Sequence, residues 1–116
     1  MASLNKVMLI GNLTKDPELK TIGESNKVCR FGMAMNKRYK TESGEEKEEV
    51  CFLSVDVWGK QGELCSKYLK KGSLTFVEGR LQSRSYEKDG VKHFVLEVVA
   101  DRVQFLDKKE KDETIA

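Results

Sequence analysis

The chain has 116 residues, of which 34% are charged, and its formal net charge is only +2. A chain of this length builds one domain, and so small a net charge identifies no partner by itself. No apolar run approaches the roughly 18 residues of a membrane span, and no hydrophobic leader follows Met1, so we expect neither a membrane partner nor export.

The charges are unevenly distributed. Residues 40–49 hold two Lys and five Glu, and residues 107–116 hold three Lys and four acidic residues. The rest of the chain carries 16 basic against 10 acidic residues. An acidic loop and an acidic tail on a basic body weakly indicate a phosphate-binding surface.

Three cysteines and one histidine could in principle carry chemistry. Cys29, Cys51 and Cys65 form no CxxC or Cys/His spacing, which argues against a zinc site or a disulfide framework and favours a reducing compartment. Each cysteine lies among apolar residues, so we expect three buried, inert thiols. His93 has no nucleophile or carboxylate cluster beside it, and the acidic run 42–49 lacks calcium-loop spacing. We therefore expect no metal, no cofactor and no catalytic residue.

Hydrophobic alternation at a period of two predicts five strands. In chain order they are residues 4–13, 28–37, 50–58, 73–86 and 92–106. The first contains a continuous apolar run at 7–10, which suits burial on both faces. The second becomes basic at its end, around Tyr39, and a charged connector at 41–49 leads to the third. The fourth contains Glu78-Gly79, which indicates a bulge or a sharp bend.

A helix is predicted at residues 60–71, between the third and fourth strands. Leu64, Tyr68 and Leu69 recur at helical spacing, and Gly72 stands at the stop position. Asp89-Gly90 predicts a tight turn between the last two strands.

Five strands of this length cannot lie flat without exposing a broad apolar face. Closing them into a barrel, with the helix filling the gap between the third and fourth strands, solves that problem. We therefore predict an all-β, five-stranded Greek-key barrel of the oligonucleotide/oligosaccharide-binding (OB) type. The domain spans residues 1–106, and residues 107–116 form a short polar tail that we expect to be disordered.

The strand at 50–58 carries the clearest functional signal. Cys51, Leu53, Val55 and Val57 form an ordinary core face. The opposite face mixes large rings with polar groups, namely Val50, Phe52, Ser54, Asp56 and Trp58. A core face would exclude Asp56, and a plain solvent face would not carry the only Trp. Rings on a polar face indicate a platform for flat ligands, of which unpaired nucleic-acid bases are the commonest.

Several short segments occur in a characteristic order and spacing across residues 4–106. They are Gly11-Asn12-Leu13 with Asp16-Pro17-Glu18, Trp58-Gly59-Lys60, Tyr68-Leu69-Lys70-Lys71-Gly72-Ser73, Val77-Glu78-Gly79-Arg80-Leu81 and Val99-Ala100-Asp101. Together these segments resemble the bacterial single-stranded DNA-binding protein family. The resemblance implies a cytoplasmic, nucleoid-associated homotetramer that binds single-stranded DNA in replication, recombination and repair.

The resemblance also implies which residues bind DNA. The stacking rings fall on Tyr39, Phe52, Trp58 and Tyr86. The family's phosphate contacts map onto Lys60, Lys71 and Arg84; we add Arg38 from its basic setting, and Lys6 and Arg80 as local candidates. The remaining rings fit the core better, namely Phe31, Phe76, Phe94 and Phe105.

The chain departs from the family pattern at the rings, at some basic positions and at its end. Three rings that are usually Trp are Tyr or Phe here, and the usual Phe is Trp58. Ser54, Gln82 and Ser85 replace frequent basic residues. The family ends in an acidic, Phe-tipped peptide that recruits replication and repair enzymes. This sequence stops at Ala116 without that peptide, so either recruitment is lost or altered, or the chain is shortened.

Three other functions stay open at this stage. A related barrel could serve primosome assembly or bind RNA. A small barrel nuclease would need clustered carboxylates or a histidine on the ring-bearing face, which offers only Asp56. A purely structural oligomer would leave the rings unexplained unless they lie between subunits.

Overall fold

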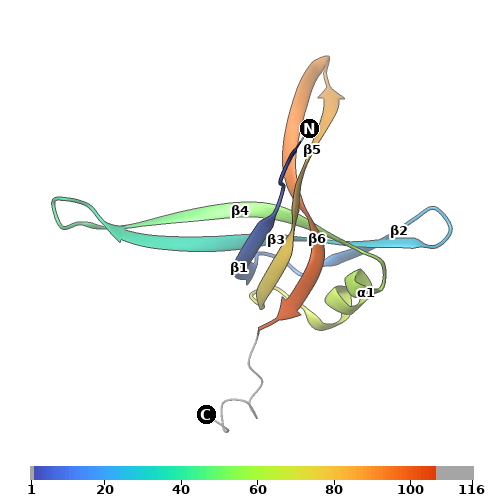
Figure 1. The fold of residues 1–116 in the computed structure, drawn as a ribbon, viewed down its shortest axis with the longest axis horizontal. Coiled ribbons are helices and arrows are strands. Elements are labelled where there is room, and N and C mark those ends of the chain that lie inside the picture. Colours follow the sequence, from blue (N-terminus) through green and yellow to red (C-terminus); the bar gives the residue numbers. More distant parts are fainter. Residues whose placement is uncertain (1, 107–116) are drawn as a thin grey trace, which may run out of the picture.

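A computed structural model describes residues 2–106 and shows a small barrel from which three hairpins project (Figure 1). The elements are β1 (Val7–Leu13), β2 (Glu18–Ile22), β3 (Asn26–Lys40), β4 (Glu46–Trp58), α1 (Gly59–Tyr68), β5 (Leu74–Lys88) and β6 (Val91–Phe105). The strand order is β1-β5-β6-β4-β3-β2, and an additional β1–β3 pairing closes five of the strands into a ring. The predicted five-stranded barrel, with its helix between the third and fourth predicted strands, is confirmed.

Two seams of this ring are short. β4 and β6 run parallel and pair only at Val55 with Val98 and at Asp56 with Val99. β1 and β3 pair only at Asn12 with Ala34 and at Leu13 with Met33. The other strand pairs of the ring are longer and antiparallel, so the barrel is held chiefly by the β3–β4 and β5–β6 hairpins and by the β1–β5 pairing.

The short strand β2 was not predicted. Its five residues are all exposed, and their sequence shows no hydrophobic alternation that would predict a strand. The strand forms because it is joined to β3 by a hairpin turn, in which Gly23 adopts a positive φ of 70°, and pairs with β3 alone.

The core fills the ring with inward side chains, and α1 covers one end of it. The fully buried residues include Met33, Val55, Val57, Val77 and Val98. The helix ends at Tyr68 rather than at 71, and it buries Gly62 and Cys65 rather than the predicted face of Leu64 and Tyr68. Leu69, just past the helix, is buried as predicted.

The β1 strand is buried on one face only. Val7 and Leu9 pack against the core, whereas Met8 and Ile10 are exposed. The prediction of burial on both faces is therefore wrong. No helix or second sheet covers the outer face of β1 in the described chain.

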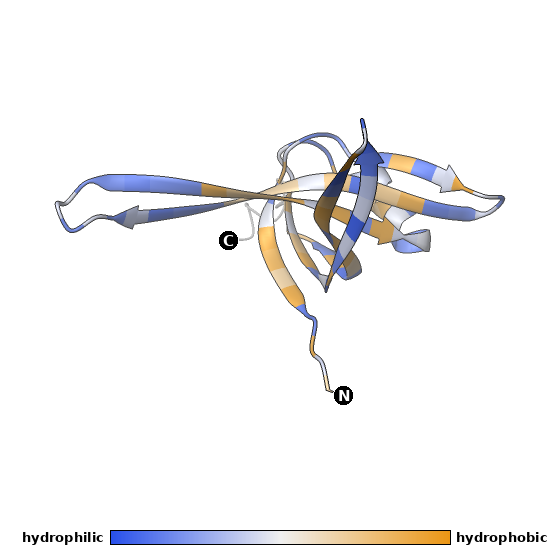
Figure 2. Cartoon of the chain, turned by 90° about the horizontal axis from the view of Figure 1, so that it is seen from above, coloured by the Kyte–Doolittle hydropathy of each residue, from blue (hydrophilic) through white to orange (hydrophobic). Residues whose placement is uncertain are grey.

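The β3–β4 hairpin extends much further than predicted. β3 continues to Lys40 and β4 begins at Glu46, so the connector shrinks to residues 41–45. Opposite charges face each other across the added pairs, for example Lys37 with Glu49 and Arg38 with Glu48. We call residues 36–50 the β3–β4 arm; its outer half is strongly hydrophilic (Figure 2).

The predicted bend and tight turn are both confirmed. The β5–β6 register shifts between Glu78 and Gly79, as a bulge requires. Asp89 and Gly90 have positive φ angles of 53° and 77°, the combination that a two-residue hairpin turn needs.

Some predicted core positions are exposed instead. Cys51 lies where the β3–β4 hairpin leaves the barrel, Phe94 lies on the exposed outer part of the β5–β6 hairpin, and Phe105 is exposed near the end of β6. Phe31 is buried and Phe76 is half-buried. Burial raises the pKa of the Cys29 thiol to about 11 and that of Cys65 to about 12, so both are inert thiols as predicted, whereas Cys51 is not buried.

Candidate nucleic-acid interface

Three of the four predicted stacking rings lie on one outer face of the barrel. Phe52 and Trp58 belong to β4 and are separated by an even number of residues, so they point to the same side of the sheet. The register carries this face across the β4–β6 seam: Asp56 lies beside Val99, which is opposite Arg80 on β5. Arg84 and Tyr86 follow Arg80 at even spacing and therefore share this face.

The rings on this face are accessible. Phe52 is 66% exposed, Trp58 46% and Tyr86 51%. Tyr86 stacks on His93 of β6, with ring centroids 5.2 Å apart and planes 18° apart. A large ring normally buries most of its surface, so three exposed rings on one polar face form a surface suited to flat ligands.

Tyr39 lies apart from these rings. It pairs with Lys47 on the β3–β4 arm, whereas Phe52 pairs with Ala34. The odd spacing between Ala34 and Tyr39 places Tyr39 on the other face of the hairpin. The structure therefore does not bring all four predicted rings together.

Most predicted phosphate-contact residues already have acidic partners. Lys6 Nζ lies 2.6 Å from Glu78 Oε2, and Arg80 Nη1 lies 3.1 Å from Asp101 Oδ1. Arg84 pairs with Glu97, and Arg38 Nε lies 3.9 Å from Glu48 Oε2. The hydrogen bond with Lys6 lowers the pKa of Glu78, and the same bond raises the pKa of Lys6.

Lys60 and Lys71 differ from the other basic candidates. Within residues 2–106 neither side chain forms an ion pair. Lys60 lies in the first turn of α1, two residues after Trp58. The backbone N–H of Lys71 donates to Asp16 Oδ1 at 2.8 Å, which ties the turn after α1 to the loop after β1.

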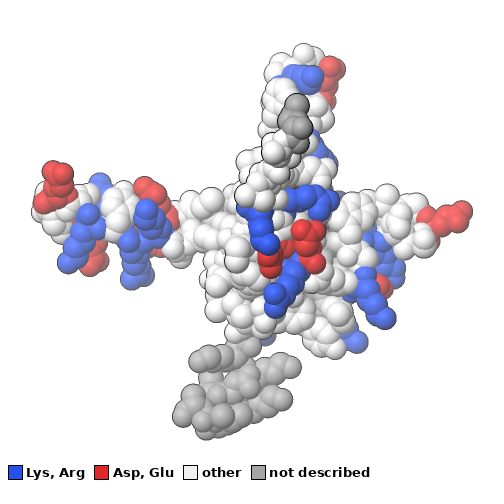
Figure 3. Space-filling view, viewed as in Figure 1, with Lys and Arg blue, Asp and Glu red and all other residues white. Residues whose placement is uncertain are grey.

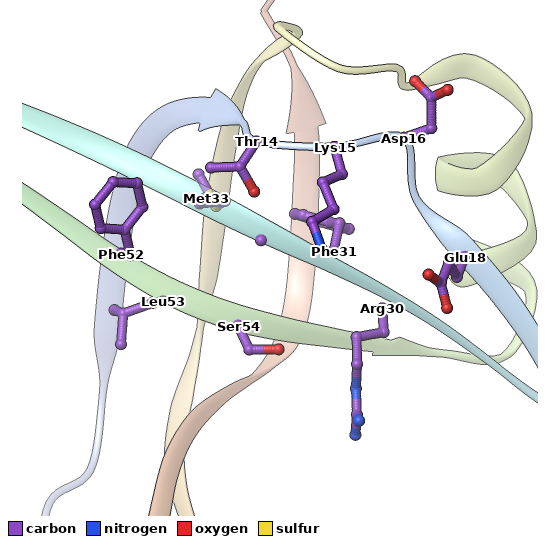
Figure 4. A pocket seen from close by; sticks show the side chains of 11 residues that line it. Thr14, Lys15, Asp16, Glu18, Arg30, Phe31, Met33, Phe52, Leu53 and Ser54 are labelled. Carbon is purple, nitrogen blue, oxygen red and sulfur yellow. The ribbon is translucent and has the colours of Figure 1, made fainter.

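Two cations on this face were not predicted from the sequence. Lys15 and Arg30 line a groove of about 380 Å³ together with Phe52, Ser54 and Gly32 (Figure 4). The Thr14 side chain lies close above Gly32, so a Cβ at this position would lie 2.6 Å from Thr14 Oγ1 unless that side chain rotated. Arg30 belongs to the predicted second strand, but its proximity to the rings depends on a strand register that the sequence does not reveal.

Basic and acidic side chains are interspersed over the barrel and along the β3–β4 arm (Figure 3).

Among residues 2–106 no cluster of three or more His, Cys, Asp or Glu could hold a metal ion. No helix in the same part of the chain is long and apolar enough to cross a membrane. The ring-bearing face itself offers aromatic surface to flat ligands and N–H donors to anionic groups.

A model of the single-strand binding protein family matches residues 4–106. The chain belongs to this family. Proteins of this family bind DNA and are not enzymes, so the expectation that this chain has no catalytic residue is confirmed. Family membership also argues against the nuclease alternative.

Similar proteins agree with this membership. Single-stranded DNA-binding protein 3 of Clostridium acetobutylicum is 49% identical over 106 residues, which cover 90% of this chain and 72% of that protein. The single-stranded DNA-binding protein of Staphylococcus aureus is 46% identical over 112 residues, covering 96% and 70% of the two chains.

Solved structures in the family share the fold. The Plasmodium falciparum SSB in complex with ssDNA matches with a TM-score of 0.85 and 28% identity, covering 92% of this chain and 98% of that one. A deletion mutant of the Thermus aquaticus single-stranded DNA binding protein matches with a TM-score of 0.79 and 36% identity, covering 90% and 51% of the chains.

Proposed function

We propose that this protein binds single-stranded DNA without reading its sequence, by stacking bases on exposed rings and contacting phosphates with Lys and Arg. The observation that carries the proposal is the joint exposure of Phe52, Trp58 and Tyr86 on one outer face that also carries arginines. Family membership supports the same function.

The rings supply affinity that does not depend on base identity. Base stacking on an aromatic side chain contributes about 1–3 kcal/mol for each base, and every base has a flat face to offer. Three rings would contribute on the order of 3–9 kcal/mol before ordering costs. Duplex DNA hides its base faces, so this surface discriminates in favour of single strands.

The cations supply a second, ionic contribution. Lysines that have no acidic partner within residues 2–106, such as Lys60 and Lys71, would displace counterions condensed on the DNA and so make binding depend on salt. The paired residues Lys6, Arg80 and Arg84 add less net charge because their partners already neutralise them. Arg38, on the same face of the hairpin as Phe52, would contact a strand that continues onto the β3–β4 arm, whereas Tyr39 would contact DNA that crosses to the other face of the arm.

We further propose that the protein acts in DNA replication, recombination and repair, in the nucleoid-associated cytoplasm. Residues 1–106 would form the DNA-binding domain. The polar tail predicted at 107–116 lies outside the described residues, so the expectation that recruitment of replication and repair enzymes is lost or altered, or that the chain is shortened, stays a prediction from sequence.

Homotetramer formation is part of the proposal. Met8 and Ile10 expose apolar surface on β1, and toward β3 the strand pairs only at Asn12 and Leu13, which leaves most of that edge open in the described chain. An apolar face beside an open edge suits pairing with a second copy. Light scattering should give a tetramer mass that falls in Met8→Asp/Ile10→Asp; a wild-type monomer would contradict the proposal.

Fluorescence anisotropy with three labelled ligands of matched length tests the binding function. We expect tight binding of oligo(dT), much weaker binding of duplex DNA, and a steep loss of affinity for oligo(dT) as salt is added. Equal affinity for duplex, or no binding of oligo(dT) at low salt, would refute the proposal. A clear preference for oligo(U) would instead favour the RNA-binding alternative.

A further inference from the structure

Four charged side chains from four strands form a continuous network on the ring-bearing face. Arg30 of β3 donates from Nε to Asp56 Oδ1 at 2.7 Å and from Nη2 to Asp56 Oδ2 at 3.1 Å. Its Nη2 also lies 3.6 Å from Glu97 Oε2. Arg84 of β5 donates to the same carboxylate of Glu97, from Nε at 2.6 Å and from Nη2 at 3.0 Å.

The carboxylates of the network are buried and the guanidinium groups are not. The side chains of Asp56 and Glu97 are 10% and 4% exposed, whereas those of Arg30 and Arg84 are 38% and 48% exposed. A buried carboxylate must be paired, so both arginines are held with the same edge, Nε and Nη2, against the protein.

Each arginine keeps donors for a ligand. A guanidinium carries five N–H groups, and two of them belong to Nη1. Among the described residues, Nη1 of Arg30 and Nη1 of Arg84 donate no hydrogen bond. The network is also electrically neutral, with two arginines against two carboxylates.

Arg30 occupies a definite place between the rings. It pairs with Asp56, while Phe52 and Trp58 lie four residues before and two residues after Asp56 on β4. At about 3.3 Å per residue the two rings are roughly 20 Å apart along the strand. Ser54 lies between Phe52 and Arg30 in the groove (Figure 4). A strand stacked on both rings would pass its backbone over Arg30.

We propose that Arg30 is a phosphate-contact residue for single-stranded DNA, with its guanidinium oriented by Asp56 and Glu97 so that Nη1 faces the strand. The inference rests on the proposed function. Because the network is neutral, Arg30 contributes directed, charge-assisted hydrogen bonds and little counterion release. Arg30 therefore differs from Lys60, whose charge has no acidic partner in the described chain.

The test measures the affinity of the wild-type protein and of one variant for two oligomers that differ only in the charge of their backbone. The variant Arg30→Met/Asp56→Val removes the guanidinium without leaving Asp56 unpaired, and circular dichroism and thermal unfolding verify its fold. The ligands are oligo(dT) and the same oligomer with uncharged methylphosphonate linkages. We expect the variant to bind oligo(dT) roughly fivefold to twentyfold more weakly, and the uncharged oligomer almost as well as the wild type does.

Two control variants distinguish a directed phosphate contact from a simple loss of charge. Lys60→Met should reduce the salt dependence of oligo(dT) binding by about one counterion, whereas the Arg30/Asp56 variant should leave it nearly unchanged. Arg30→Lys keeps the charge but loses the fixed guanidinium donors, so it should also weaken binding. If Arg30→Met/Asp56→Val folds poorly, the affinity of Arg30→Lys for oligo(dT) decides whether Arg30 contacts phosphate.

Several outcomes would overturn the inference. Unchanged affinity of a folded variant for oligo(dT) excludes the contact. An equal loss of affinity for both oligomers means that the network only braces the β4–β6 seam. If the wild-type protein binds oligo(dT), either of these outcomes overturns only the role of Arg30 and leaves the proposed function intact. If the wild-type protein does not bind oligo(dT), the role of Arg30 and the proposed function are both overturned.

Discussion

Phe52 and Trp58 stand on one face of β4, on either side of a carboxylate that Arg30 neutralises. A carboxylate beside a phosphate-binding surface would repel the ligand. Pairing Asp56 with Arg30 removes that repulsion and explains how an acidic residue can share a face with the proposed stacking rings. Phe52 stays exposed because its neighbours on this face are small or polar, namely Gly32, Ala34 and Ser54.

Removal of one ring should weaken binding without disturbing the fold. Phe52→Ala should cost about 1–3 kcal/mol of oligo(dT) affinity, because one base loses its stacking partner. Phe94→Ala is the matched control: Phe94 is equally large and also exposed, but it pairs with Ser85 on the opposite face of the β5–β6 hairpin. Isothermal titration of both variants measures the difference, and equal losses would exclude a specific role for Phe52.

The three thiols should react very differently. Cys51 is exposed, whereas burial raises the pKa of Cys29 and Cys65 to about 11 and about 12. Only the thiolate reacts, so at neutral pH we expect iodoacetamide to modify Cys51 in the native protein and all three cysteines in denaturant. Mass spectrometry counts the adducts; rapid native labelling of Cys29 or Cys65 would show that the barrel opens.

The sequence predicted individual residues well where alternation alone decides their side. Phe52, Trp58 and Tyr86 are exposed as expected because each sits on a clearly polar strand face. Arg30 could not be found in this way, since its partners Asp56 and Glu97 come from two other strands and depend on register. Cys51 and Phe94 were misplaced because alternation does not reveal where a strand leaves the barrel.

At the scale of elements, the helix α1 is fixed by very close approach to β4. A Cβ on Gly62 would collide with the backbone carbonyl of Val57 and would also lie 3.3 Å from Cys29 Cβ. The helix thus approaches the barrel at Gly62, and its apolar residues Leu64 and Tyr68 are left outside.

A methyl group at this contact should destabilise the protein. Gly62→Ala should lower the free energy of unfolding by about 1–3 kcal/mol, because backbone must move to admit the side chain. Ser66→Ala, in the same helix but without such a contact, should stay within about 0.5 kcal/mol of wild type. Urea denaturation at one protein concentration provides the comparison, and a stable Gly62→Ala protein would contradict the packing.

On the β3–β4 arm, Glu48 would compete with a DNA phosphate for Arg38. Arg38 is strongly exposed, but Glu48 lies across from it at 3.9 Å. Glu48→Gln should tighten oligo(dT) binding by roughly twofold to fivefold and steepen its salt dependence, because an exposed pair of this kind is worth only about 0.2–1 kcal/mol. Glu24→Gln, which removes an equal charge near the β2–β3 turn, is the control. Equal effects of the two variants would mean that only net charge matters.

The outer parts of the hairpins were the least predictable elements. Residues 46–49 form strand through pairing with residues 37–40, although their charged sequence favours a connector. β2 likewise owes its structure to β3. In both cases tertiary pairing prevails over local pattern, whereas the turn at Asp89-Gly90 followed directly from local residue preference.

At the scale of the whole molecule, the barrel acts as a scaffold that turns alternation within single strands into one continuous surface. The sequence predicted the ring of five strands because its apolar faces require closure. It could not predict that the parallel β4–β6 seam would bring the β4 rings onto one face with Arg84 and Tyr86. That juxtaposition is a property of topology alone.

Emission of the single tryptophan, Trp58, tests the stacking of bases most directly. The protein is titrated at low salt with oligo(dT) and with an abasic oligomer of the same length, while anisotropy of a labelled strand records binding. We predict strong quenching of Trp58 by oligo(dT) and little by the abasic strand, although its phosphates still bind. Unchanged emission at saturating oligo(dT), or equal quenching by both strands, would contradict base stacking on this face.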